Sequence, residues 1–132
     1  MKTKQVLSIE QMKHLQELGL DTSDASMCIE WRESDESKKV VTSLDADTYY
    51  DYYHETYTLQ DILDKLPKEI KTSTDTYWLG ISIYDCKEWY VCYSMSDEFD
   101  YYEEFKSRQL IDAAYEMLCW CIENGYVGKE GE

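Results

Sequence analysis

Two apolar stretches that flank a short polar loop constrain this fold more than any other feature of the sequence. They span residues 76–84 and 88–95, with Asp85-Cys86-Lys87 between them. If they pair as an antiparallel hairpin, three apolar pairs lie opposite each other: Ile83 with Trp89, Ile81 with Val91, and Leu79 with Tyr93. All six then share one face, because side chains alternate between faces along a strand. A slip of one residue would set apolar residues opposite polar ones, so the sequence predicts this register.

The opposite face of this hairpin is also rich in aromatic side chains. It carries Trp78, Gly80, Ser82, Tyr84, Tyr90 and Cys92. We expect a helix to cover it, which predicts a helix-sheet-helix sandwich. The alternative is an open platform of Trp78, Tyr84 and Tyr90 that stacks against sugars or bases. A solvent-exposed Trp78 would favour the platform.

Two helices have clear ends in the sequence. The first begins at the N-cap Ser8, with Gln11 completing a capping box, and ends at Gly19. The second begins at Thr58, with Asp61 three residues later, and ends before Pro67. The predicted buried stripes are Ile9, Met12, Leu15 and Leu18 in the first helix, and Leu59, Ile62, Leu63 and Leu66 in the second.

A third helix is predicted over residues 107–124, with Ser107 as its N-cap and Gly125 after its end. Its wide apolar face indicates the most buried helix of the domain. The face consists of Leu110, Ile111, Ala114, Tyr115, Met117, Leu118, Cys121 and Ile122.

Residues 25–44 predict a further hairpin. Met27, Ile29 and Trp31 alternate with polar neighbours, which is typical of a half-buried strand with these three side chains inside. Residues 39–44 form the predicted return strand. Residues 45–58 show no clear period and are predicted as a loop, and the acidic residues 96–106 receive no element.

These elements predict a single α+β domain over residues 1–127, followed by a flexible tail at 128–132. The predicted sheet has four mainly antiparallel strands, supplied by the two hairpins, and three helices pack around it.

The last helix and the hairpin before it resemble a known group of proteins. Residues 110–126 read Leu-Ile-Asp-Ala-Ala-Tyr-Glu-Met-Leu-Cys-Trp-Cys-Ile-Glu-Asn-Gly-Tyr. They resemble the C-terminal helix of small proteins from gut bacteria and their prophages, in which an antiparallel hairpin precedes an Asp-Ala helix. Here that hairpin runs from Tyr77 to Tyr93. The arrangement is also similar to the phage helix-sheet-helix sandwich family. The resemblance covers residues 58–127 and implies a small accessory protein of a mobile element.

Charge excludes several classes of partner. The formal net charge is −15, so phosphate backbones would repel the chain and direct nucleic-acid binding is not expected. No apolar run is long enough for a transmembrane helix, and no membrane partner is expected. The N-terminus does not resemble a signal peptide, and five cysteines are an odd number. Both features predict reduced thiols and a cytoplasmic protein.

No metal, cofactor or catalytic site is expected. Cys119 and Cys121 would point about 200° apart on a helix, so they cannot share an ion. Asp45, Asp47 and Asp51 begin a calcium-loop pattern, but its sixth and twelfth positions are Tyr50 and Thr56. Cys86, in the hairpin loop, is the best candidate for a reactive thiol. Neither histidine, His14 or His54, is placed beside it by the sequence, so we predict a non-enzymatic protein.

Acidic residues and tyrosines form the candidate interaction surface. Its members are Asp45, Asp47, Tyr49, Tyr50, Asp51, Tyr53, Asp97, Glu98, Asp100, Glu103 and Glu104. One interpretation is that this charge keeps the protein soluble. The predicted function is protein–protein contact by an accessory protein of a prophage or mobile element. The identity of the protein partner stays open, and a basic protein is one candidate. The alternative is an acidic mimic of nucleic acid that inhibits a basic host nucleic-acid-binding protein. The oligomeric state stays open.

Overall fold

The computed structural model describes residues 4–31, 38–42, 52–83, 86–95 and 101–128. Within these ranges the elements are, in chain order, α1 (Ile9–Glu17), β1 (Met27–Trp31), β2 (Lys38–Thr42), β3 (Tyr52–Thr56), α2 (Leu59–Lys65), β4 (Glu69–Lys71), β5 (Thr76–Ile83), β6 (Trp89–Ser94), β7 (Tyr101–Ser107) and α3 (Leu110–Glu123). The α+β class, the three helices and a four-stranded antiparallel sheet are confirmed. No helix in the described ranges is long and apolar enough to cross a bilayer.

The ends of α1 and α2 lie where the sequence predicts them. The Ser8 hydroxyl accepts a hydrogen bond from the Gln11 backbone N–H at 3.1 Å, and the Gln11 side chain accepts one from the Ser8 N–H at 3.0 Å. Thr58 and Asp61 form the same reciprocal pair at the start of α2. These bonds satisfy backbone donors that a helix leaves unpaired at its first turn. Gly19 follows α1 with a φ of 99°, the left-handed conformation that favours glycine.

The last helix starts later than predicted. Its N-cap is Gln109, and Ser107 is the last residue of β7, where it lies opposite Trp89 of β6. The Ser107 hydroxyl accepts a hydrogen bond from the Gln109 N–H at 3.2 Å. The prediction of Ser107 as N-cap is therefore wrong, because strand pairing holds it in the sheet. Gly125 does follow the helix end, with a φ of 78°. Most residues of α3 are buried, as predicted.

The predicted hairpin register is confirmed in the four-stranded sheet, whose order is β4-β5-β6-β7. Ile83 lies opposite Trp89, Ile81 opposite Val91, and Leu79 opposite Tyr93. The flanking strands β4 and β7 were not predicted. The first hairpin, β1–β2, does not join this sheet as predicted. It belongs to a separate three-stranded sheet of order β2-β1-β3, because β3 pairs with the other edge of β1.

This three-stranded sheet corrects two further predictions. Tyr52–Thr56 is the strand β3, although residues 45–58 were predicted as a loop. Along β1 the exposure alternates as predicted, but the sense is reversed. Cys28 and Glu30 are buried, while Met27 and Ile29 are half-buried. The period of a strand predicts the alternation, and the placement of the whole sheet decides which side is inside.

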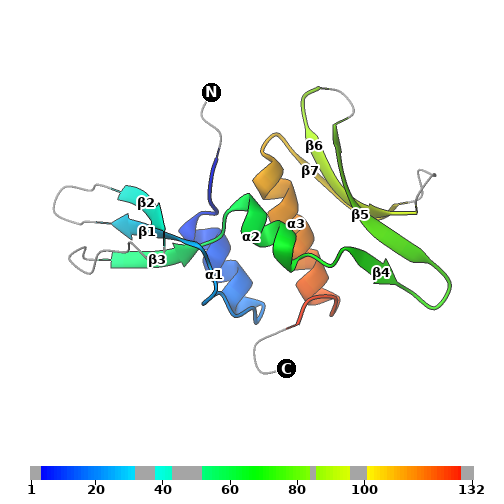
Figure 1. Ribbon diagram of the computed structural model, residues 1–132, viewed down its shortest axis with the longest axis horizontal. Coiled ribbons are helices and arrows are strands. Elements are labelled where there is room, and N and C mark those ends of the chain that lie inside the picture. The colour runs from blue at the N-terminus through cyan, green and yellow to red at the C-terminus, as the bar shows by residue number, and fades with distance from the viewer. Residues whose placement is uncertain (1–3, 32–37, 43–51, 84–85, 96–100, 129–132) are drawn as a thin grey trace.

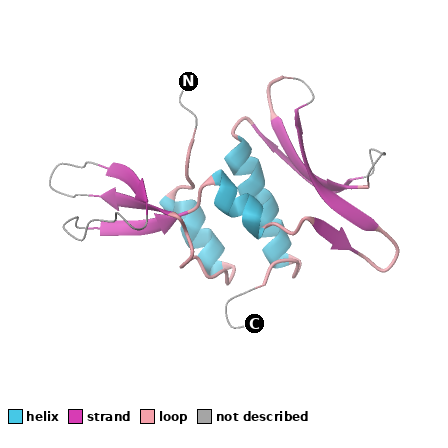
Figure 2. Cartoon of the chain, viewed as in Figure 1, coloured by secondary structure: helices cyan, strands magenta, loops and turns pink. Residues whose placement is uncertain are grey.

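The three helices lie between the two sheets, and α3 packs on one face of the four-stranded sheet (Figures 1 and 2). Leu79, Val91, Tyr93 and Phe105 join the core on that face. No described helix covers the opposite face, where Trp78 is 45% exposed. The helix-sheet-helix arrangement is therefore absent from the described part of the chain, and that expectation is corrected.

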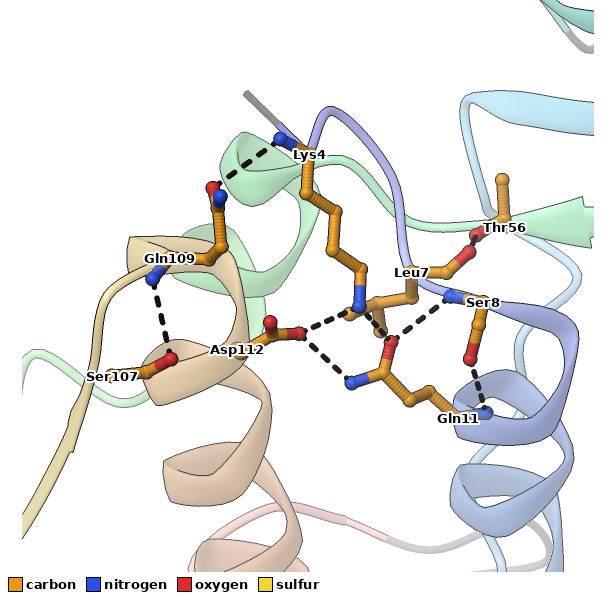
Figure 3. A network of polar contacts seen from close by, with 8 residues as sticks. All are labelled: Lys4, Leu7, Ser8, Gln11, Thr56, Ser107, Gln109 and Asp112. Carbon is orange, nitrogen blue, oxygen red and sulfur yellow. Dashed lines mark hydrogen bonds and ion pairs between the residues drawn. The ribbon is translucent and has the colours of Figure 1, made fainter. Parts of the chain in front are cut away.

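The N-terminal segment ties α1 to α3 (Figure 3). The Lys4 ammonium group donates to Asp112 at 2.7 Å and to Gln11 at 2.8 Å. The Gln11 side-chain amide also donates to Asp112, at 3.0 Å. The Thr56 hydroxyl donates to the Leu7 carbonyl oxygen at 2.7 Å, which connects β3 to the same segment. Residues distant in the sequence thus fix α1, β3 and α3 relative to one another.

Candidate interaction surface

The outer edge of β5 is only partly paired. The strand β4 lies opposite Thr76–Trp78 of β5, and the Leu79 N–H donates to the Lys68 carbonyl oxygen at 3.0 Å. In an antiparallel strand, the backbone N–H and C=O of every second residue point to the same side. The backbone groups of Ile81 and Ile83 therefore point to the same side as those of Leu79. No strand within the described ranges pairs with them there.

Apolar side chains stand beside this open edge. Ile81, Ile83 and Trp89 are 42%, 43% and 37% exposed. The hairpin register places them on the face that also carries Val91 and Tyr93, both fully buried in the core. The apolar face of the hairpin therefore continues beyond the part that the core covers. We call the open edge of residues 81–83, with the side chains of Ile81, Ile83 and Trp89, the β5 edge surface.

The two edges of the sheet differ in how they are protected. The opposite edge strand, β7, carries Glu103, Glu104 and Lys106 and has an irregular register where it passes Tyr93 and Ser94. Charges and bulges are the usual features that prevent an edge strand from pairing with another chain. Residues 79–83 of β5 contain no charged residue and no proline. The β5 edge surface is therefore the less protected edge.

The acidic candidate surface is only partly covered by the structure. Asp45, Asp47, Tyr49, Tyr50, Asp51, Asp97, Glu98 and Asp100 lie outside the described residues. Tyr53 lies in β3, opposite Glu30 of β1. Glu103 and Glu104 are consecutive residues of β7, so their side chains leave opposite faces of the strand. These two carboxylates therefore do not form one contiguous patch.

The cysteines separate into one exposed thiol and four buried ones. Cys86 is exposed, while Cys28, Cys92, Cys119 and Cys121 are buried, and all five are free. Burial raises the pKa of the Cys121 thiol to about 11. Burial also raises the pKa of the Cys119 thiol to about 11, although a hydrogen bond from Tyr115 acts in the opposite direction. Thiolates are the reactive form, so these buried groups are suited to packing.

The two histidines make contacts with other residues. The His14 ring lies 6.4 Å from that of Tyr115, and His54 Nδ1 lies 2.8 Å from the backbone oxygen of Glu55. Within the described ranges, no three His, Cys, Asp or Glu side chains gather closely enough to hold a metal ion.

Comparison with known proteins gave no match: no family model, no curated protein and no solved structure is significantly similar to this chain. The chemistry of its surfaces is therefore what indicates its function.

The β5 edge surface was missed in the sequence analysis. Its side chains were placed on one face of the hairpin, but no part of that face was identified as exposed. The feature that reveals this surface is the length of β4. Its three residues cannot pair with the whole of β5, which has eight.

Proposed function

We propose that this protein acts by binding another protein through the β5 edge surface. An extended segment of the partner adds as a further strand beside Ile81 and Ile83. Its backbone pairs with the open N–H and C=O groups, and its apolar side chains cover Ile81, Ile83 and Trp89. The observation that carries this proposal is an unprotected strand edge beside three exposed apolar side chains.

The net charge of the chain indicates which kind of protein partner is favoured. The chain has a formal net charge of −15, whereas residues 79–83 are uncharged. Long-range attraction favours a basic protein, and the neutral edge leaves the contact itself to hydrogen bonds and apolar packing. An accessory protein of a prophage or mobile element that works by contact would use such a surface.

The test is capture of the partner by two variants of the tagged chain. Ile81→Lys with Ile83→Lys places two charges on the β5 edge surface. Val40→Lys places a charge at another exposed aliphatic residue, which is 45% exposed on β2. We expect the double variant to bind the partner at least about tenfold more weakly, and Val40→Lys to bind it as the unmodified chain does. Circular dichroism of each variant checks that the fold is retained.

Washing at low and then high salt separates this proposal from nucleic-acid mimicry. A partner held by strand addition stays bound at high salt, because backbone hydrogen bonds and apolar contacts are weakly screened. A partner that high salt releases, and that the double lysine variant still binds, would overturn the proposal. That outcome would favour the acidic mimic.

A further inference from the structure

A cleft beside α3 shares no residue with the β5 edge surface. It has a volume of about 340 Å³ and lies between α1, β7 and α3. It is lined by His14, Phe105, Tyr115, Glu116, Cys119, Trp120 and Glu123. Its volume is within the range of small-ligand sites, which start at about 300 Å³.

Aromatic rings from two elements form the walls of the cleft. Phe105 comes from β7, and Tyr115 and Trp120 come from α3. The Trp120 ring meets the Tyr102 ring nearly at right angles, with ring centres 5.4 Å apart. It also contacts the Tyr126 ring at the same distance between centres. These contacts orient the Trp120 ring without a ligand.

Carboxylates line the same cleft. Glu116 and Glu123 are seven residues apart, about two helical turns, so they lie on one face of α3. Both are exposed, and neither forms an ion pair with any residue of the described ranges. The pKa of the Tyr115 phenol is raised, mainly by burial and a hydrogen bond to Cys119, and further by the charges of Glu116 and Glu17. The Tyr115 ring and the Glu116 carboxylate thus line the same cleft.

We propose that this cleft binds an organic cation, a guanidinium or alkylammonium group carried on an apolar stem. The rings of Phe105, Tyr115 and Trp120 pack against the stem and attract the positive charge through their faces. Glu116 and Glu123 supply the opposite charge. An anion would be repelled by both carboxylates, and a neutral apolar ligand would remove water from them without replacing its hydrogen bonds.

The test is an NMR titration of the ¹⁵N-labelled full chain with butylguanidinium. The reporters are the indole N–H of Trp120 and the backbone amide of Glu116. We expect saturable shifts at both reporters. Butylurea has nearly the same shape without the charge, and we expect it to produce no saturable shift. The absence of saturation by butylguanidinium, or equal binding of butylurea, would overturn the proposal.

Charge-matched variants show whether the cation binds in the cleft. Glu116→Gln and Glu123→Gln should each weaken the affinity by about two- to fivefold, the usual range for one exposed ion pair. Glu10→Gln removes the same charge from an exposed residue of α1 that does not line the cleft. We expect it to leave the affinity unchanged. An equal loss of affinity in all three variants would show that binding depends on the net charge of the protein and not on the carboxylates of the cleft. That result would overturn the proposal.

The cation can belong to a small molecule or to a basic side chain of a protein. A capped pentapeptide, Gly-Gly-Arg-Gly-Gly, and its citrulline counterpart distinguish these sources. Binding of the arginine peptide at least as tightly as butylguanidinium assigns the cleft to a protein side chain. Exclusion of the peptide, with butylguanidinium still bound, assigns it to a small molecule. Both outcomes support the cation site, whereas equal binding of the citrulline peptide would overturn it.

Discussion

At the scale of single residues, Cys86 occupies an unusual backbone conformation. Its φ is 62°, in the left-handed region that costs a residue with a Cβ about 1–2 kcal/mol. Glycine adopts this conformation freely but loses more chain entropy on folding. We therefore expect Cys86→Gly to raise the free energy of unfolding by about 0.5–1 kcal/mol, measured by urea denaturation. Cys86→Ser keeps the Cβ and is the control, with a change within about 0.5 kcal/mol. A glycine variant less stable than the serine variant would contradict this account.

Single residues also show what a sequence pattern can predict. The position of Cys86 in the hairpin loop predicted that its side chain is exposed, and the structure confirms this. The period of β1 predicted alternation, but Glu30 is buried, while Met27 and Ile29 are only half-buried. Trp78 was expected under a helix and is exposed. Local spacing sets which side chains share a face, while the choice of the buried face depends on elements distant in the sequence.

At the scale of elements, Asp61 connects α2 to the start of β1. Its carboxylate accepts hydrogen bonds from the Thr58 N–H at 3.0 Å and from the Ser26 hydroxyl at 2.6 Å. The Ser26 N–H also donates to this carboxylate, at 3.3 Å. Asp61→Ala removes all three bonds, and loss of a helix cap costs about 0.5–2 kcal/mol. We expect the free energy of unfolding to fall by about 1–2 kcal/mol.

Asp64→Ala is the matched control for that measurement, because Asp64 is an exposed carboxylate of the same helix. It accepts a hydrogen bond from the Gln60 side chain at 2.8 Å. We expect a loss within about 0.5 kcal/mol. Equal losses in the two variants would show that the contact with Ser26 and the cap contribute nothing specific.

The elements that were predicted and those that were missed differ in one respect. Capping residues marked the ends of α1 and α2, and apolar pairs marked the β5–β6 register, so all of these could be predicted. The strands β3, β4 and β7 are short or acidic, and each pairs with a strand that was itself predicted. Their own sequences carry little signal, because the partner strand supplies the hydrogen bonds that make them strands.

At the scale of the whole molecule, both proposed sites arise from contacts that local patterns do not encode. The cleft brings His14 of α1 to Tyr115 of α3 across about a hundred residues of sequence. The β5 edge surface exists because β4 ends before it can cover Ile81 and Ile83. The residue types at these places were visible in the sequence, but their assembly required the fold.

Two buried tyrosines make the whole fold sensitive to alkaline pH. Tyr57 and Tyr93 are fully buried, and burial raises the pKa of both phenols well above the usual range. Tyr57 donates to the Asp24 carboxylate at 3.1 Å, and Tyr93 donates to the Pro67 carbonyl oxygen at 2.8 Å. The folded chain keeps these protons at a pH where the unfolded chain releases them. Their stabilisation is therefore complete below about pH 10 and is lost as the pH rises above it.

We expect the free energy of unfolding to fall above pH 10 by about 1.4 kcal/mol per pH unit for each of the two tyrosines. The buried thiols of Cys119 and Cys121, whose pKa values are raised to about 11, act in the same direction from about pH 9. Urea denaturation between pH 8 and 11 measures the slope, and absorbance at 295 nm counts the tyrosinates formed before unfolding. Tyr57→Phe removes one of the titrating groups, so its slope above pH 10 should be shallower by about 1.4 kcal/mol per pH unit. An unchanged slope in that variant would mean that the Tyr57 phenol ionises equally in the folded and unfolded chains, contrary to its burial against Asp24.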